Sequence, residues 1–202
     1  MELAAQYDCS RMTVNKALSQ LAKSGLIERR KRSGSFVTQP HAQSAVLEIR
    51  DIKAEVQSLG LAYDYELLKR EQRRADGEER ERLELKAGSI VLALQCRHFA
   101  GHTPFSYEER VINLAEAATQ AFDKSAPGPW LLERVPWSAA EHRIRAVGAD
   151  AHMAGVLEIP EGAACLRVER RTRMNGVYVT LVQLTYPGQA FELVANFAPT
   201  QS

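Results

Sequence analysis

Apolar side chains recur at helical spacing near the start of the chain. They lie three or four positions apart and mark one face of a helix: Val14, Ala17, Leu18 and Leu21. Ser10, just before them, is a typical N-cap, and Gly25 stands after them, where a left-handed C-cap is favoured. The pattern therefore predicts an amphipathic helix that begins at Ser10.

A basic hairpin is predicted directly behind this helix. Residues 26–29 and 35–38 form short extended segments, and residues 30–34 between them have the composition of a turn. Basic side chains occupy all of residues 29–32. Such a run is usually only a solvated face. Here it follows a helix with a polar first turn, which favours phosphate contact and predicts a winged helix-turn-helix that binds double-stranded DNA.

The helix and the hairpin together supply the candidate DNA contacts. Arginine and asparagine side chains match the major-groove edges of guanine and adenine, and the other basic side chains neutralise phosphates. The candidate residues are Ser10, Arg11, Thr13, Asn15, Lys16, Arg30, Lys31, Arg32, Ser33 and Gly34.

Beyond residue 47 the pattern changes to strands with interspersed helices. The predicted strands are residues 61–70, 89–99, 104–113, 140–147, 164–174, 177–186 and 190–197. The predicted helices are residues 51–59, 75–85, 114–122, 128–135 and 151–157. Asn175-Gly176 is the pair most typical of a tight hairpin turn. Hairpins of this kind predict an α+β domain with a mostly antiparallel sheet, helices on one face and a pocket on the other.

These elements divide the chain into three parts. Residues 1–38 form the predicted DNA-binding domain, residues 39–47 a linker that contains Pro40, and residues 48–202 the sheet domain. The net charge is only +1, but it is unevenly distributed. Residues 1–38 carry four more basic than acidic residues, and the remaining residues carry three more acidic than basic residues. Because phosphate binding depends on the local field, this asymmetry supports the DNA-binding prediction.

Composition excludes several classes of protein. Hydrophobic residues make up 45% and charged residues 25%, as in ordinary globular proteins. No apolar run approaches the roughly 20 residues that cross a bilayer, and the start has no signal-peptide pattern. The three cysteines are scattered, which is typical of a reducing compartment. We therefore expect a cytoplasmic protein that does not bind membranes.

No catalytic or cofactor motif stands out. The sequence has no glycine-rich phosphate loop and no serine nucleophile elbow, and its five histidines lack metal-ligand spacing. We therefore expect no enzyme activity, no metal and no cofactor. Polar side chains do interrupt apolar strands, where burial is costly unless they are paired or bind a ligand. The candidate pocket residues are Arg97, Phe99, Tyr107, Glu108, His142, Tyr178, Thr180 and Tyr186. A solvated sheet face, or an Arg97–Glu108 ion pair, is the structural alternative.

The residues that carry these predictions also resemble a known family. Residues 2–18, 25–27 and 33–37 resemble the GntR family of bacterial repressors, and the remainder resembles the UTRA effector-binding domain, whose fold is similar to that of chorismate lyase. Within that group, residues 104–113, 129–137 and 140–144 resemble the HutC subfamily of histidine-utilisation repressors. Relative to the family, residue 1 falls inside the second helix, so the resemblance implies a winged helix without its first helix.

The resemblance implies a homodimeric repressor of histidine-degradation genes that urocanate releases from DNA. It places the family's pocket arginine at Arg97, its acidic partner at Glu108, and late-strand pocket positions at Thr180 and Tyr186. Relatives often have Arg-x-Arg where this chain has Gln95-Cys96-Arg97, which favours a monocarboxylate over a sugar phosphate. A sugar phosphate or another small anion as effector, and a lyase-like enzyme acting on a small aromatic acid, remain alternatives.

Overall fold

The computed structural model describes residues 7, 10–23, 27–30, 34–37, 51–117 and 119–192. The chain divides into two compact units, one containing residues 1–48 and the other residues 49–193. Each unit is described by itself.

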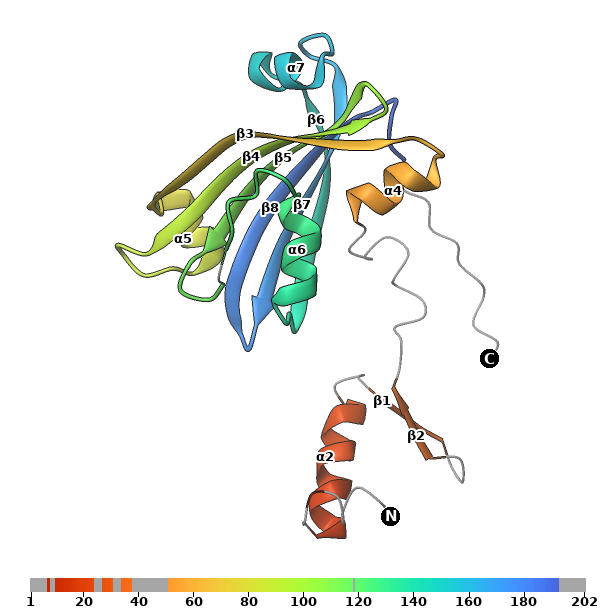
Figure 1. The fold of residues 1–202 in the computed structure, drawn as a ribbon. Coiled ribbons are helices and arrows are strands. Elements are labelled where there is room, and N and C mark those ends of the chain that lie inside the picture. The colour runs from red at the N-terminus through yellow and green to blue at the C-terminus, as the bar shows by residue number, and fades with distance from the viewer. Residues whose placement is uncertain are drawn as a thin grey trace. The chain divides into compact units, whose positions relative to one another are not determined.

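The first unit consists of a helix and a two-stranded hairpin (Figure 1). Helix α2 spans Arg11–Lys23, and the Ser10 hydroxyl accepts a hydrogen bond from the Thr13 backbone N–H at 3.1 Å. Strands β1 (Ile27–Arg30) and β2 (Gly34–Val37) pair antiparallel, and α2 contacts β1. The predicted capped helix and hairpin are therefore confirmed.

The second unit is built on one six-stranded antiparallel sheet with the order β3-β4-β5-β8-β7-β6. Two long hairpins, β4–β5 and β7–β8, lie side by side through the pairing of β5 with β8. Strands β3 and β6 form the two edges. The strands are β3 (Tyr63–Arg74), β4 (Ile90–Ala100), β5 (Thr103–Asn113), β6 (Ala139–Gly148), β7 (Ala164–Met174) and β8 (Val177–Pro187).

Helices cover both faces of this sheet, which corrects the prediction that they cover only one (Figure 1). Helices α4 (Ile52–Ser58) and α6 (Pro127–Arg134) pack on one face, against apolar side chains of β4, β5 and β8. Helices α5 (Gly77–Leu83) and α7 (Ala151–Leu157) pack on the opposite face. Each face of the sheet therefore has its own core, and the apolar side chains on both faces of the strands are buried.

Short polar caps explain where the smaller helices begin. Asp51 and Asp150 accept hydrogen bonds from the backbone N–H groups of Lys53 and Met153. Asp76 and Glu79 form a reciprocal capping box at the start of α5. These carboxylates satisfy N–H groups that a helix leaves unpaired at its first turn.

The predicted hairpin turn at Asn175-Gly176 is confirmed. Both residues have positive φ, 51° and 86°, as a two-residue turn with right-handed strand twist requires. The turn of the β4–β5 hairpin contains Gly101, whose φ is 63°.

Two sequence-based predictions in this unit have a different outcome. The predicted helix over residues 114–122 is wrong: the described residues there form a turn after Asn113, whose side chain accepts the Ala115 N–H, and irregular backbone. Ala117 and Phe122 are buried against the sheet, so packing rather than helical hydrogen bonding holds the segment. Of the predicted last strand, residues 190–192 do not belong to a strand, and residues 193–197 lie outside the described residues.

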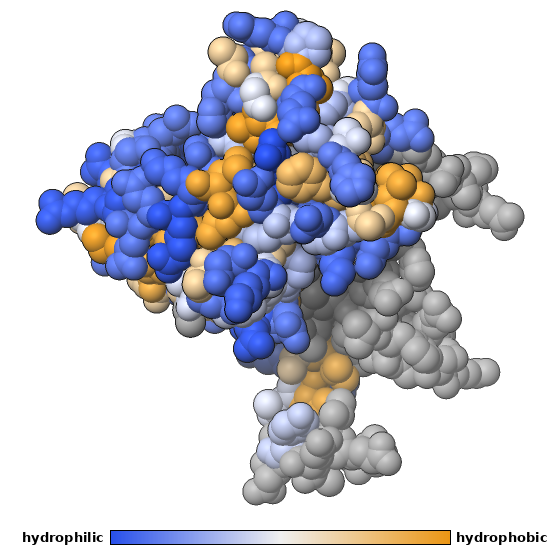
Figure 2. Space-filling view, turned by 45° about the horizontal axis from the view of Figure 1, so that its top comes forward, coloured by the Kyte–Doolittle hydropathy of each residue, from blue (hydrophilic) through white to orange (hydrophobic). Residues whose placement is uncertain are grey.

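Charged and polar side chains cover most of the sheet unit's surface in Figure 2, and hydrophobic colour is confined to separate patches. The large exposed apolar side chains of this unit are Leu59, Leu61, Leu68, Ile90, Trp137 and Val177. None of the described helices has the length and apolar character needed to span a bilayer.

Glu79 gives a stability test of this fold, because it is buried and has several partners. Its carboxylate accepts from Arg73 at 2.6 and 2.7 Å and from the Asp76 backbone N–H at 3.0 Å. We expect Glu79→Ala to lower the free energy of unfolding by about 2 kcal/mol, because it leaves a cap donor and a guanidinium unpaired. Glu78→Ala is the matched control: its exposed pair with Arg82 is worth less than about 0.5 kcal/mol. Urea unfolding measures both, and equal losses would contradict the prediction.

Candidate functional site

A narrow cleft lies between helix α6 and the sheet face that α4 also covers. It has two adjoining halves, which we call together the α6 cleft. Both halves are lined by Arg110, Gly128, Leu132 and Arg170. The first half adds Asp51, Ile52, Tyr63, His98, Glu108, Ala126, Pro129 and Leu184, and the second adds Leu131, Val135, Trp137, Thr172, Val179 and Thr180. Both halves are narrow: each has a cavity volume of about 20 Å³, which is room for little more than one water molecule.

A buried ion pair forms the floor of the first half. Arg110 Nε donates to Glu108 Oε1 at 2.5 Å, and the two residues are only 4% and 1% exposed. Burial by itself raises the pKa of Glu108, but the charge of Arg110 and the hydrogen bond from His98 outweigh it and hold that pKa at about 2. Glu108 is therefore a carboxylate at neutral pH, and it neutralises one of the two arginines of the cleft.

His98 extends this pair into a hydrogen-bond relay. Its Nε2 lies 3.0 Å from Glu108 Oε2, and its Nδ1 lies 2.9 Å from the Tyr63 hydroxyl. Because an ionised carboxylate only accepts, Nε2 carries the hydrogen of this contact. In the neutral ring, Nδ1 therefore accepts the hydrogen of Tyr63. Burial and the nearby Glu108 charge raise the pKa of Tyr63, so its hydroxyl keeps that hydrogen.

Arg170 is the cation of the cleft that lacks a partner. Its side chain is 6% exposed and lines both halves of the cleft. Among the residues that the structure describes, none forms a hydrogen bond or an ion pair with its guanidinium. Burial, and then the like charge of Arg110, lower its pKa to about 10, which still leaves it protonated at neutral pH. An unpaired buried cation is costly, so an anion bound in the cleft would offset that cost.

The first turn of α6 closes over these charges. It passes so near Arg110 that a Cβ on Gly128 would lie 3.4 Å from Nη2. Ala126 precedes the helix without a side-chain cap, and Pro127 occupies the first turn. The positive end of a helix therefore faces the cleft together with the two guanidinium groups.

Four of the predicted pocket residues lie on this face of the sheet. Glu108 and Thr180 line the α6 cleft. His142 stands directly opposite Arg170 in the pairing of β6 with β7, but it does not line the cleft. Burial, and then Arg170, lower the pKa of His142 to about 4. Tyr186 is buried under α4, where its ring stacks on Phe191.

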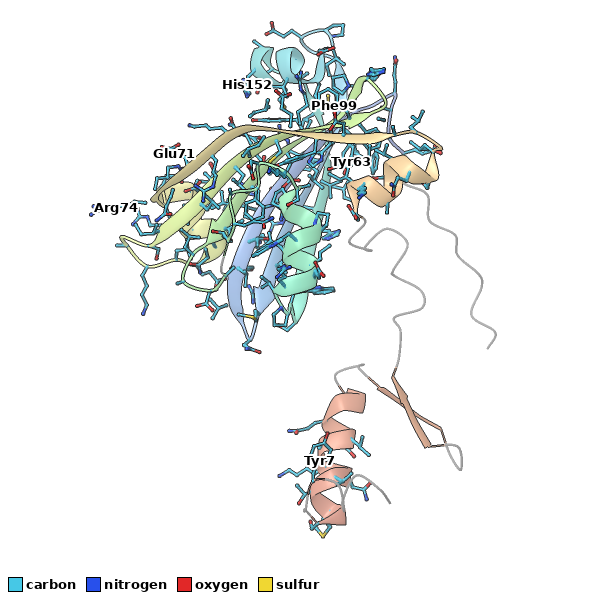
Figure 3. All side chains as sticks on the ribbon, viewed as in Figure 1. Tyr7, Tyr63, Glu71, Arg74, Phe99 and His152 are labelled. Atoms are coloured by element: carbon cyan, nitrogen blue, oxygen red, sulfur yellow. The ribbon has the colours of Figure 1, made fainter. Side chains whose placement is uncertain are left out.

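Arg97, Phe99 and Tyr107 lie on the opposite face, so the prediction that they share a pocket with Glu108 is wrong. Arg97 pairs across the strands with Tyr107, whereas Glu108 pairs with Cys96. Figure 3 shows Phe99 on the side of α7, which carries His152, and Tyr63 on the side of α4. Side chains of neighbouring strand residues point to opposite faces, so Tyr107 and Glu108 cannot line one pocket.

Arg97 is held by internal contacts instead. Its guanidinium forms ion pairs with Glu66 at 2.8 Å and Glu158 at 3.2 Å, and donates to the Val156 carbonyl. It also lies 4.8 Å from the centre of the Phe99 ring. Arg97 therefore ties β3 and the end of α7 to β4, and the alternative Arg97–Glu108 pair is excluded as well.

The predicted position of Tyr178 beside Thr180 is also wrong. Simple alternation along β8 predicts that Tyr178 and Thr180 share a face. The register shifts between Thr172 and Arg173, so that Thr172 pairs with Thr180 but Arg173 pairs with Tyr178. The extra residue, Val179, lies in the α6-side core, and Tyr178 packs on the other face with Leu83 of α5. Arg171 and Arg173 lie over the Tyr178 ring, so it is not open to a ligand of the cleft.

The predicted pocket residues do not include most of the cleft lining, and the basic and imidazole side chains that are missing from them are Arg110, Arg170 and His98. A signal existed for Arg110, because it stands two positions from Glu108 and therefore on the same face. No comparable signal exists for His98 and Arg170, whose positions depend on strand pairing across the sheet.

The predicted DNA contacts fall on the first unit. Thr13, Asn15 and Lys16 are exposed on the first turns of α2, and the Thr13 hydroxyl lies 2.8 Å from that of Ser10. Arg11 begins the helix, Arg30 ends β1 and Gly34 begins β2. Lys31, Arg32 and Ser33 lie outside the described residues.

A helix with a hairpin wing, joined to a domain with a cationic cleft, defines the class of ligand-responsive transcription regulators. Residues 1–37 match the model of the bacterial regulatory proteins of the gntR family, and residues 58–192 match that of the UTRA domain. The chain therefore belongs to the GntR family and carries a UTRA domain. Its DNA partner and its small-molecule effector follow from these two domains.

Several similar proteins are named histidine utilization repressor. That of Pseudomonas aeruginosa is 31% identical over 200 residues, which are 98% of this chain and 80% of the relative. That of Klebsiella aerogenes is 32% identical over 199 residues, 97% of this chain and 83% of the relative. These relatives are transcription regulators, so the chain is a regulator rather than a lyase-like enzyme.

Solved structures agree with this assignment. The C-terminal domain of histidine utilization repressor from Pseudomonas syringae superposes with a TM-score of 0.64 at 26% identity, covering 68% of this chain and 99% of that one. PhnF from Mycobacterium smegmatis superposes with a TM-score of 0.68 at 19% identity, covering 98% and 89%, and supports the fold alone.

Glu108 gives a test of the cleft's electrostatics. Its pKa of about 2 lies below the ordinary value, so ionised Glu108 stabilises the fold above about pH 4.5, and this contribution is lost as the pH falls towards 2. We expect Glu108→Gln to lose about 3–5 kcal/mol at neutral pH, because Arg110 stays buried and loses its counter-charge. On acidification, the free energy of unfolding of Glu108→Gln should fall less steeply than that of the wild type.

Glu109→Gln is the matched control for this measurement. Glu109 neighbours Glu108 but lies half-buried on the opposite face. Urea unfolding of the three proteins at several pH values measures the effect. Identical acid dependence in the wild type and Glu108→Gln would contradict the assignment.

Proposed function

We propose that this chain represses genes of histidine utilisation and that urocanate, bound in the α6 cleft, releases it from DNA. The observation that carries the proposal is the charge balance of the cleft: two buried arginines, Arg110 and Arg170, face one buried carboxylate, Glu108. Among the buried groups one positive charge remains, because Asp51 at the mouth of the cleft is only half-buried and caps α4. This charge matches a monocarboxylate. The histidine-utilisation assignment is supported by the names of the relatives that cover almost the whole chain.

The side chains of the two halves suit the two ends of urocanate, and α6 would have to move away from the sheet to admit them, because each half has room for about one water molecule. Its carboxylate would bind at Arg170, the guanidinium without a partner, with Arg110 beside it. Its flat imidazole ring would occupy the second half, against Trp137 and Leu131. The hydroxyls of Thr172 and Thr180 line the same half and are suited to hydrogen bonds with the ring nitrogens.

A sugar phosphate is the second candidate effector, because two guanidinium groups in one cleft also suit a phosphate. Glu108 weighs against it, since this carboxylate already neutralises Arg110 and would lie near the second negative charge of a phosphate. We therefore favour the monocarboxylate.

On the DNA side, we propose that α2 enters the major groove. Arg11, Thr13 and Asn15 would contact bases or phosphates, and Lys16 with the basic wing residues would neutralise phosphates. A homodimer would then bind a near-palindromic operator whose half-sites lie about one helical turn apart.

Replacing Arg170 tests the effector site. Urocanate at 100 times its dissociation constant should stabilise the wild-type protein by about 2.7 kcal/mol, seen as a rise in Tm. We expect Arg170→Ala to abolish that rise. Arg97→Ala is the matched control and should keep it, because Arg97 lies on the opposite face. The reverse outcome, with the rise lost only in Arg97→Ala, would contradict the site.

Two substitutions in α2 test the DNA interface. Lys16→Ala should weaken binding to all DNA sequences alike and reduce the salt slope by about one ion, since it removes one phosphate contact. Asn15→Ala should relax the preference at one base position of the operator. Fluorescence anisotropy on operator and scrambled DNA at several salt concentrations measures both. Gln20→Ala, exposed further along the helix, is the control, and equal effects of all three would rule out the assigned contacts.

A further inference from the structure

The hydrogen-bond relay behind the cationic cleft has a property that anion binding alone does not require. It runs from Arg110 through Glu108 and His98 to Tyr63, and both His98 and Tyr63 line the first half of the cleft. His98 is 1% exposed, and both of its ring nitrogens are engaged. A histidine in this position links the charge of the cleft to the hydrogen-bonding direction of Tyr63.

We propose that His98 sets the number of negative charges that the α6 cleft accepts: a monoanion binds without a change of protonation, whereas a dianion binds together with one proton that His98 takes up. The proposal rests on the α6 cleft being the anion site of the proposed function. It concerns the charge of the ligand, and so separates monocarboxylate effectors from phosphate esters.

The proton that is taken up offsets the second negative charge of a dianion. With His98 neutral, Arg110, Arg170 and Glu108 sum to one positive charge, which a monoanion cancels. A second negative charge in the cleft favours protonation of the nearest titratable group. The proton comes from solvent and binds to His98 Nδ1, while Nε2 keeps its hydrogen and continues to donate it to Glu108.

Protonation also reverses the contact with Tyr63. Nδ1 changes from acceptor to donor, so the Tyr63 oxygen accepts the new hydrogen. The hydroxyl hydrogen of Tyr63 is thereby freed to donate to an anion in the cleft, which Tyr63 lines. One proton thus adds a charge and a hydrogen-bond donor at the same place.

The other titratable and charged groups near His98 come from four strands and the start of α4. They are Tyr63 and Tyr65 on β3, Cys96 on β4, Glu108 and Arg110 on β5, Arg170 on β7 and Asp51 at the mouth of the cleft. Glu108 stays ionised, and burial raises the pKa of the Cys96 thiol to about 12. Histidine is the side chain that ordinarily changes charge between about pH 6 and 8.

The test titrates the full chain with sulfate and with cinnamate, following the fluorescence of its tryptophans, one of which, Trp137, lines the cleft. Sulfate stays a dianion and cinnamate a monoanion over the whole range, and chloride holds the ionic strength constant. We expect sulfate to bind at least about tenfold more tightly at about pH 6 than at about pH 8, because one proton per binding event permits up to tenfold for each pH unit. Cinnamate should change less than about twofold.

Variants identify the group that takes up the proton. His98→Asn should make sulfate binding independent of pH, whereas His142→Asn, which changes the imidazole opposite Arg170, should keep the pH dependence. Tyr63→Phe should weaken sulfate binding mainly at low pH. Tyr65→Phe is its matched control, because that hydroxyl, also near His98, donates to the Phe122 carbonyl instead.

Three results would overturn the proposal. Sulfate binding that is equal at the two pH values in the wild type overturns it without the need of any variant. Full pH dependence in His98→Asn also overturns it. If neither anion binds at either pH, the cleft is not an anion site, and the proposed function fails with it.

Discussion

The buried pair of Glu108 and Arg110 is the interaction on which the arrangement of the cleft depends. A carboxylate that is 1% exposed persists only with partners, and Glu108 has two, Arg110 and His98. This pair forms one end of the relay and leaves Arg170 without a hydrogen bond or an ion pair among the described residues. An anion in the cleft would supply the missing counter-charge, and the proposed effector site rests on this feature.

The sheet separates binding from support. One face carries the α6 cleft, and the opposite face carries ion pairs that hold the structure together, such as Arg97 with Glu66 and Glu158. Two strongly basic side chains, Arg97 and Arg110, thus have different roles: Arg97 pairs with Tyr107, and Arg110 stands three positions beyond Tyr107 and therefore on the other face. The register shift at Val179 moves Tyr178 from the ligand side to the structural side in the same way.

As a member of the GntR family, the chain combines a DNA-binding unit with an effector-binding domain. The α2 helix and its hairpin form a DNA-binding unit, and the UTRA domain supplies the anion cleft. The basic excess of residues 1–38 and the acidic excess of the remainder suit this division, since only the first part needs to attract phosphate.

The sequence alone determined the features that depend on local chemistry: the Ser10 cap, the basic hairpin, the Asn175-Gly176 turn, the antiparallel sheet and the family. It also identified Glu108, because a charged residue in an apolar strand demands a partner. Only the tertiary structure decided which residues share the site with Glu108. Strand pairing, not sequence distance, brings Arg170 of β7 and His98 of β4 to it, and two register shifts decide which side chains face the cleft. Alternation along one strand cannot show these features, because each depends on a partner strand that lies far away in the chain.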